Sequence, residues 1–434
     1  MDRIKWLDGL KGVAALIVAF NHYFHGHIDP PYRSFWDSPV EENRHLIQLP
    51  PIRLLWQVYA MVPLLMVASG YSISQRLLHL RDSNSPVLFL RRLQSSAFRR
   101  PLRLYLPVCL LATISQVAFF TGLYNDHYAD NVLRPLQPWT GPMAHVKYLC
   151  RYLVDGMNPI NFVWTEGLNG QYWSMPHELR GSYIVYLVIL TMCFWRPAVR
   201  VRALTGLLAY LLWYGHWDVF SFVGGLYLAE LQVTDITSTR QDATRKSTTY
   251  YGRYLAFLFG IYLLCLRGET ELPPEYRILS PLQPDHWTRH NEWCDARFSW
   301  NAIGSALVVF AISGLPRLQR PLNSRPAQYL GSIAFPLYLV HELVFRTGRN
   351  WLINAIWGSL VVDSPYPWGQ HDRAMDSLGS FLVTWLSSGL VLGAFTMAAA
   401  HFYVCFVELR FERWVNSLDV YMLGRDSNSE RKGD

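Results

Sequence analysis

Three histidines in largely apolar surroundings are the residues of this sequence best suited to catalysis. His22 lies just after the apolar run of residues 12–20, and His341 follows Leu-Tyr-Leu-Val. His177 precedes Glu178 at the start of another apolar run. Imidazole titrates near neutral pH and can take the proton of a hydroxyl group, and a carboxylate can orient or tune it. We therefore expect general acid–base chemistry, with His22, Glu178 and His341 as the catalytic residues.

The spacing between Lys11 and His22 is typical of a helix that enters a membrane. The two residues are eleven positions apart, which in an α-helix places His22 about three turns deeper and on nearly the same face. An ionisable residue at membrane depth is costly unless it faces protein or a water-filled cavity, so it indicates function by default. A packing histidine with satisfied hydrogen bonds is the alternative.

Basic residues near the expected cytosolic side form a second candidate group. Arg99, Arg100 and Arg103 follow one another closely, and Lys11 is expected in the same layer. These side chains could hold the phosphates of a donor substrate, or they could contact anionic lipid and set topology. Both interpretations stay open.

Metal and hydrolase motifs are weak. His177-Glu178 and His341-Glu342 resemble the start of a zinc protease helix, but neither has a second histidine four residues after the first. A set of His22, His25 and His27 with Asp29 could bind a metal, although Asp29 precedes two prolines in a loop. Neither a Gly-x-Ser-x-Gly elbow nor a phosphate-binding P-loop is present. We expect no bound metal.

Composition indicates a membrane protein. The chain has 434 residues, of which 51% are hydrophobic and only 16% charged, and the apolar residues are grouped into runs. The net charge of +7 comes from basic residues in short connections, where they set topology and meet lipid headgroups. We therefore expect membrane lipid around the protein and no nucleic-acid partner.

Apolar runs separated by basic connections predict an all-α integral membrane protein with a single bundle of about ten transmembrane helices. By the positive-inside rule both termini are cytosolic. We expect one membrane domain at residues 1–412 and a polar cytosolic tail at 413–434. Cys150 and Cys294 fall in two long polar connections and could pair, although a coincidence is an equal alternative. The expected spans lie at about 10–25, 53–75, 104–124, 179–195, 203–214, 218–232, 254–266, 300–315, 328–345 and 378–405.

Five motifs, in this order, resemble the acyltransferase 3 family of polytopic membrane acyltransferases, and in particular its fungal branch. They are Leu-Asp-Gly-Leu-Lys-Gly-Val-Ala-Ala at 7–15 with His22, Ser-Gly-Tyr at 69–71, Phe-Arg-Arg-Pro-Leu-Arg-Leu-Tyr-Leu-Pro at 98–107, Trp-Ser-Met-Pro-His-Glu-Leu-Arg-Gly-Ser at 173–182 and Leu-Tyr-Leu-Val-His at 337–341. The resemblance implies transfer of an acyl group, usually acetyl, from acyl-CoA to a hydroxyl group of a sugar or a small lipophilic molecule.

Two positions depart from the family pattern. Lys11 stands where the family usually has arginine, so the charge is kept but the bidentate fork is lost. Pro336 stands where a small polar residue is more common, which predicts a kink just before His341.

Together these observations predict an enzyme in which His22 is the general base, Glu178 orients or tunes an imidazole, and His341 is a second acid–base or positioning group. Acyl-CoA is the expected donor, held by the four basic residues named above, and no cofactor is permanently bound. The expected acceptor is a small lipophilic hydroxyl compound such as a fungal terpenoid or polyketide, in the endoplasmic reticulum or another endomembrane. A glycan or glycolipid acceptor is the alternative, and a transporter or a non-catalytic scaffold is the alternative of another class. The remaining expected substrate contacts are Asn21, Trp173, Ser174 and Tyr338.

Overall fold

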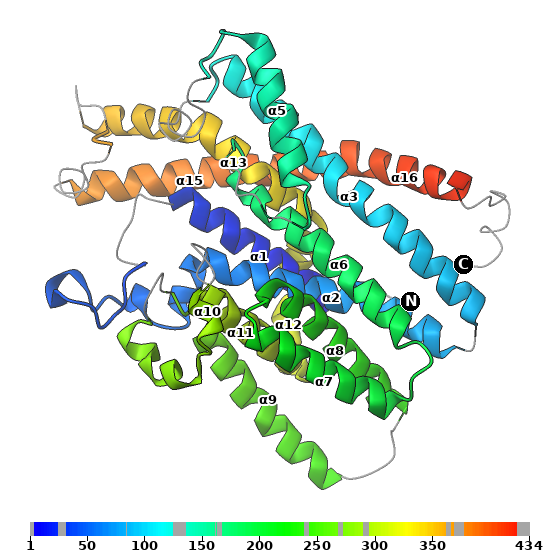
Figure 1. Ribbon diagram of the computed structural model, residues 1–434. Coiled ribbons are helices and arrows are strands. Elements are labelled where there is room, and N and C mark those ends of the chain that lie inside the picture. The colour runs from blue at the N-terminus through cyan, green and yellow to red at the C-terminus, as the bar shows by residue number, and fades with distance from the viewer. Residues whose placement is uncertain are drawn as a thin grey trace. The chain divides into compact units, whose positions relative to one another are not determined.

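The computed structural model is helical, and no strand occurs in the residues that it describes (Figure 1). Those residues are 4–24, 32–83, 85–124, 136–160, 162, 167–237, 243–267, 272–289, 295–361, 366–368 and 377–422.

The helices are divided between two compact units, which are described separately. The first unit comprises Met1–Asn21, Ile28–Ala97 and His177–Ser332, and the second comprises His22–His27, Phe98–Pro176 and Ile333–Asp434. Four helices contribute residues to both units: α1 (Lys5–Phe24), α3 (Pro86–Phe120), α6 (Ser174–Thr191) and α13 (Arg325–Leu360).

The remaining elements belong to one unit each. The first unit contains η2 (Val40–Glu42), η3 (Leu46–Gln48), η4 (Ile52–Trp56), α2 (Val58–Asp82), α7 (Pro197–Trp213), α8 (Trp217–Thr237), α9 (Ala243–Leu264), η6 (Pro274–Leu282), α10 (His286–Arg289), α11 (Asp295–Gly314) and α12 (Pro316–Leu322). The second contains α5 (Pro142–Gly156), η5 (Gly170–Trp173), α15 (Leu378–Tyr403), the π-helical turn η7 (Val404–Glu408) and α16 (Leu409–Met422).

Glycines at helix crossings determine the packing of the first unit. A Cβ atom added to Gly70 of α2 would lie 2.2 Å from the carbonyl oxygen of Phe222, and one added to Gly225 of α8 would lie 2.2 Å from that of Val67. Helices α2 and α8 lie side by side (Figure 1). Their backbones approach this closely only because neither glycine has a side chain.

The glycines of the first sequence motif have the same role. A Cβ atom on Gly12 would lie 2.3 Å from the backbone nitrogen of Gly331, and one on Gly9 would lie 2.0 Å from the carbonyl oxygen of Leu322. The beginning of α1 therefore packs directly against the end of α12 and the beginning of α13.

Buried polar side chains tie the second unit together. The Tyr23 hydroxyl donates to the carbonyl oxygen of Trp385 at 2.9 Å, and the Ser115 hydroxyl donates to Asn169 Oδ1 at 2.9 Å. Tyr152 donates to the backbone carbonyl of Asn169 at 2.9 Å. These bonds satisfy groups that would otherwise be costly to bury.

A helix occupies each of the ten expected spans. Four helices in the described part of the chain are long and apolar enough to cross a membrane: Val58–Asp82, Pro86–Phe120, Ala296–Gly314 and Leu378–Met422. The count of ten crossings and the side of the two termini stay predictions.

Two segments differ from the simplest expectation. The basic connection expected at about 76–103 is almost entirely helical, because α2 continues to Asp82 and α3 begins at Pro86. Arginine, leucine and glutamine favour helix, and proline is well suited to a first helical position. The expected boundary between residues 412 and 413 falls inside α16. The chain from 423 onward and Cys294, one partner of the possible cysteine pair, lie outside the described residues.

Candidate active site

His22 and His341 are in direct contact in the second unit. Nδ1 of His22 lies 2.7 Å from Nε2 of His341, and the two rings are nearly parallel, with an interplanar angle of 18°. His22 lies in the last turn of α1, and His341 lies within α13. His341 is completely buried, whereas the His22 side chain is 20% exposed. Of the two imidazoles, His22 is therefore the one that a substrate can reach.

The hydrogen bonds of His341 fix the protons of both rings. Nδ1 of His341 lies 3.1 Å from the carbonyl oxygen of Leu337, one turn earlier in α13. A carbonyl oxygen only accepts, so this nitrogen carries the hydrogen, and Nε2 of a neutral His341 has the lone pair. Nδ1 of His22 then donates to Nε2 of His341, and Nε2 of His22 carries a lone pair. His22 is thus in the form that a general base requires.

Glu342 is a carboxylate close to this pair among the residues that the structure describes in the second unit. Its Oε1 atom lies 3.6 Å from Nδ1 of His22, and its Oε2 atom accepts a hydrogen bond from Nε of Arg346 at 2.5 Å. Arg346 lies one helical turn further along α13, so the ion pair holds the carboxylate in place. A negative charge at this distance stabilises the imidazolium that forms when His22 takes up a proton.

Arg349 holds the backbone that carries His22. Its Nη1 atom donates to the carbonyl oxygen of Tyr23 at 3.1 Å, and the residue is only 7% exposed. The last carbonyl groups of a helix have no partner within the helix, and a basic side chain there also interacts favourably with the helix dipole. Arg349 therefore fixes the end of α1, where His22 is located.

Two expected substrate-binding residues form an anchor next to His341, and their contact with substrate stays a prediction. The hydroxyl groups of Ser174 and Tyr338 lie 2.7 Å apart, and Tyr338 donates to the carbonyl oxygen of Gln171 at 2.8 Å. Gln171 in turn donates to the carbonyl oxygen of Leu339 at 3.0 Å. These groups are buried, so they fasten the segment before α6 to α13. Trp173 lies in η5 of the same segment and is half-buried.

Glu178, the carboxylate expected to act with the histidines, is half-buried on α6 in the first unit. Its neighbour His177 contacts Asp218 of α8, with Nδ1 and Oδ2 2.9 Å apart. Asn21 is buried in the first unit and donates to the carbonyl oxygen of Trp56 at 2.7 Å. The structure brings His22 and His341 together, but the place of Glu178 relative to them stays a prediction.

The four expected donor-binding cations are also divided between the units. In the first unit Lys11 donates to the Ser72 hydroxyl at 2.7 Å. In the second, Arg99 donates to Asn416 of α16 at 2.8 Å, and Arg103 forms an ion pair with Glu412 of the same helix. Arg100 is half-buried between them on α3. Helix α16 thus supplies partners for two of the arginines, which the sequence did not indicate.

Comparison with known proteins identifies the family. The profile of acyltransferase 3, described as an acyltransferase domain, matches residues 4–400. The chain belongs to the acyltransferase 3 family. It is 26% identical over 381 residues to O-acetyltransferase PaAT-1 of Phomopsis amygdali, a match that covers 79% of this chain and 72% of that protein.

Two other fungal relatives agree with this assignment. Acyltransferase R4 of a Phoma species is 22% identical over 405 residues, and acyltransferase clz18 of Cochliobolus lunatus is 22% identical over 414 residues. Each match covers 81% of this chain and 85% of the relative. No solved structure gives a significant match. As a member of the acyltransferase 3 family, the protein is a membrane acyltransferase.

Sequence reasoning assigned no role to three residues at the histidine pair of this acyltransferase 3 protein. Glu342 entered the sequence analysis only as part of an incomplete zinc motif, and Arg346 and Arg349 follow the expected span. The spacing of four between Glu342 and Arg346 predicts an ion pair on one helix face. That they face the end of α1 depends on tertiary packing, which the spacing alone does not indicate.

His22, His341 and Glu342 can be tested as a metal site. One ligand atom from each of His22, His341 and Glu342 lies within 4.8 Å of the others. Two imidazole nitrogens on a tetrahedral zinc ion would be about 3.3 Å apart, given zinc–nitrogen bonds of about 2.0 Å. The observed 2.7 Å is shorter and fits a shared proton. That this acyltransferase 3 site binds no metal stays a prediction, and His25, His27 and Asp29 lie outside the described residues.

Proposed function

We propose that this acyltransferase transfers an acyl group, typically acetyl, from acyl-CoA to a hydroxyl group of a small lipophilic acceptor. The observation that carries the proposal is the hydrogen-bonded chain from the Leu337 carbonyl through His341 to His22. It puts a lone pair on the more accessible of the two histidines, which is what abstraction of a hydroxyl proton requires. The name of the relative PaAT-1, an O-acetyltransferase, supports acetyl as the acyl group.

The reaction follows from this arrangement. Nε2 of His22 takes the proton of the acceptor hydroxyl as its oxygen attacks the carbonyl carbon of the thioester. The resulting imidazolium is stabilised by Glu342, and Nδ1 of His22 keeps its hydrogen bond to His341. Collapse of the tetrahedral intermediate breaks the carbon–sulfur bond, and the proton passes from His22 to the leaving thiolate. The products are the acyl ester and free CoA, and the histidine is regenerated. Glu178 keeps its expected role of orienting or tuning an imidazole.

The donor would be held by Lys11, Arg99, Arg100 and Arg103 through the phosphates of CoA. Arg99 and Arg103 contact side chains of α16. A bound phosphate would therefore share or replace these contacts. We expect α16 to shift its position when the donor binds.

The acceptor is proposed to be a secondary metabolite such as a terpenoid or polyketide alcohol, because the relatives are fungal acyltransferases. The protein would act in the endoplasmic reticulum or another endomembrane, with ten membrane-spanning helices and both termini in the cytosol. A lipophilic acceptor suits this location since it can enter a membrane-embedded site from the bilayer.

The test is acyl-CoA turnover in membranes that contain the wild-type protein or its His22→Ala variant. The acceptor is a lipophilic extract of the host, and mass spectrometry detects any product heavier by one acyl group. A positioned acid–base residue contributes about 10² to 10⁴ in rate, so the variant should lose turnover by that factor. The matched control is His401→Ala, which removes an exposed histidine of α15.

The proposal is wrong if His22→Ala retains wild-type turnover. An acylated glycan with no lipophilic product would favour the glycan acceptor. If correctly folded wild-type protein forms no product and hydrolyses no acyl-CoA, the result would favour the transporter hypothesis.

A further inference from the structure

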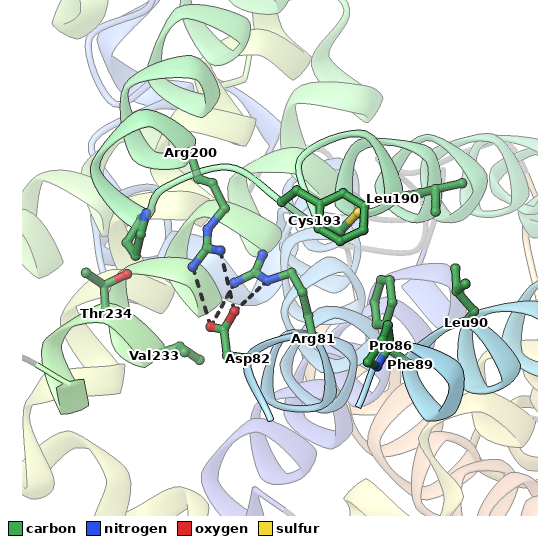
Figure 2. Close-up of a pocket in the computed structure, with 12 residues that line it drawn as sticks. Arg81, Asp82, Pro86, Phe89, Leu90, Leu190, Cys193, Arg200, Val233 and Thr234 are labelled. Carbon is green, nitrogen blue, oxygen red and sulfur yellow. Dashed lines mark hydrogen bonds and ion pairs between the residues drawn. The ribbon is translucent and has the colours of Figure 1, made fainter. Parts of the chain in front are cut away.

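A cavity of about 660 Å³ lies in the first unit where the ends of several helices meet (Figure 2). This volume is within the range of about 300–1,000 Å³ typical of ligand pockets. The lining comes from the end of α2, the beginnings of α3 and α7, the end of α6 with the turn after it, and α8. The lining residues are Arg81, Asp82, Pro86, Phe89, Leu90, Leu190, Cys193, Phe194, Pro197, Arg200, Val233 and Thr234.

One side of the cavity is a compact network of ion pairs. Arg81 donates two hydrogen bonds to Glu230, at 2.9 and 3.0 Å, and Arg200 donates to the same carboxylate at 2.7 Å. Both arginines also contact Asp82 (Figure 2). Two guanidinium groups thus balance two carboxylates, so this side of the cavity is polar but carries no net charge.

The other side is apolar and continues onto the surface. Phe89 and Leu190 lie across from the ion pairs in Figure 2. Leu90 is 50% exposed, Leu190 41% and Phe194 90%. These three side chains line the cavity and also remain exposed, so the apolar wall of the cavity is continuous with an apolar surface. An apolar wall of this kind suits a hydrocarbon chain that enters from the surface.

Basic residues flank two of the lining residues in the sequence. Arg91 follows Leu90 and Arg196 precedes Pro197, and both arginines are exposed. They belong to the connections that the positive-inside rule places on the cytosolic side. Because Asp82 and Glu230 are already paired with Arg81 and Arg200, Arg91 and Arg196 are cations in addition to this balanced network.

We propose that this cavity binds one anionic glycerophospholipid of the cytosolic leaflet. The acyl chain lies against Phe89, Leu90 and Leu190, and the headgroup phosphate lies near Arg91 and Arg196. The complementarity is twofold, since an apolar wall suits the chain and a basic rim suits the anion. The proposal is independent of the acyl-transfer chemistry. A lipid is favoured over the water-soluble CoA donor because the apolar wall continues onto exposed apolar side chains.

The test uses the purified full-length protein after delipidation in detergent. Native mass spectrometry measures binding of added dioleoylphosphatidylserine, and dioleoylphosphatidylcholine is the comparison lipid. Leu190→Trp fills the cavity and should abolish the tight phosphatidylserine adduct. The matched control, Leu187→Trp, adds the same ring at a 62% exposed position one turn earlier on α6 and should bind like wild type.

A separate set of variants tests whether the basic residues contribute to lipid binding. The double variant Arg91→Gln, Arg196→Gln should weaken phosphatidylserine binding about 30-fold, which is the effect expected of two surface cations near an anionic leaflet. Arg320→Gln removes an exposed cation of α12 and should have no effect. If Leu190→Trp fails to fold, a photoreactive phosphatidylserine replaces it, and the label should map to peptides around residues 86–91 and 190–197.

Three results would overturn the proposal. Equal binding of phosphatidylcholine would show that the headgroup charge does not matter. An equal loss of phosphatidylserine binding with Leu187→Trp would show that the lipid does not bind in the cavity. Displacement of the lipid by acetyl-CoA or by glycerophosphoserine would instead assign the site to a soluble anion.

Discussion

At the scale of single residues, the histidine pair divides two tasks between two imidazoles. His341 is inaccessible and bonded to a backbone carbonyl, so in the proposed mechanism it sets the proton position of its partner. His22 is the more accessible of the two, and in the proposed mechanism its Nε2 atom takes up and releases the proton. In serine hydrolases a carboxylate orients the histidine directly. Here a second imidazole occupies that position, and Glu342 lies slightly further away at 3.6 Å.

Glu342→Gln tests the proposed contribution of this carboxylate. The amide keeps the shape of the side chain but no longer stabilises a positive charge on His22. Turnover should fall by about tenfold to a hundredfold, which is part of what a general base supplies. The KM for acyl-CoA should be unchanged, because the lost interaction belongs to the transition state. Steady-state kinetics in membranes separate the two constants.

The parallel variant Glu178→Gln distinguishes the two carboxylates. A drop in kcat for Glu178→Gln with normal turnover for Glu342→Gln would restore the sequence-based assignment. A raised KM in Glu342→Gln would mean that the residue supports donor binding.

At the scale of elements, close helix crossings explain why glycine occurs in the first two sequence motifs. Gly12 and Gly331 allow contact between α1 and α13, and Gly70 and Gly225 allow contact between α2 and α8. Without a hydrophobic driving force in lipid, such close van der Waals packing is a main source of helix association. The glycines are therefore positioning elements of the bundle.

Gly225→Ala should destabilise the protein by about 1–3 kcal/mol, the usual cost of overpacking. Its new Cβ atom would meet the carbonyl oxygen of Val67 at 2.2 Å, and backbone cannot move aside as a side chain can. Gly206→Ala is the matched control, because nothing lies within 4 Å of its Cβ position on α7. Alanine in an exposed helix interior is favoured over glycine by about 1 kcal/mol.

The measurement is the thermal midpoint of the detergent-solubilised protein, followed by size-exclusion chromatography. Gly225→Ala should lower the midpoint and Gly206→Ala should leave it equal or higher. A lower midpoint for both variants would show that the loss is a general effect of substitution and not of the crossing.

At the scale of the whole molecule, the sequence predicted the features that depend on the pattern of residues along a single helix. Apolar runs predicted helices in the right segments, and His22 and His341, which were expected to act in one catalytic site, lie in contact. It did not predict the ion pair of Arg81 with Glu230, whose partners are 149 residues apart. Nor did it predict that α16 supplies partners for Arg99 and Arg103. Such contacts depend on which helix faces meet, and the pattern along one helix does not specify its neighbour.

The orientation of the molecule in the membrane is a prediction that cysteine labelling can test. Cys150 is exposed on α5, which the basic connections place on the far side of the membrane. Arg320 is exposed on α12, which they place in the cytosol. In sealed microsomes, where the cytosolic face points outward, a membrane-impermeant maleimide should label Arg320→Cys at once. It should label Cys150 only after the membrane is permeabilised.

Both measurements use proteins with a single cysteine, in which every other native cysteine is serine. A cysteine-free variant gives the background, and detergent-permeabilised samples show that both sites react when the reagent has access. Labelling of Cys150 in sealed microsomes, together with protection of Arg320→Cys, would invert the orientation. The proposed donor-binding cations and the lipid cavity would then face the lumen, where acyl-CoA would need its own route across the membrane. Labelling of both sites would place them on the same side of the membrane. The number of crossings between them would then be even, whereas the alternation of basic connections predicts an odd number.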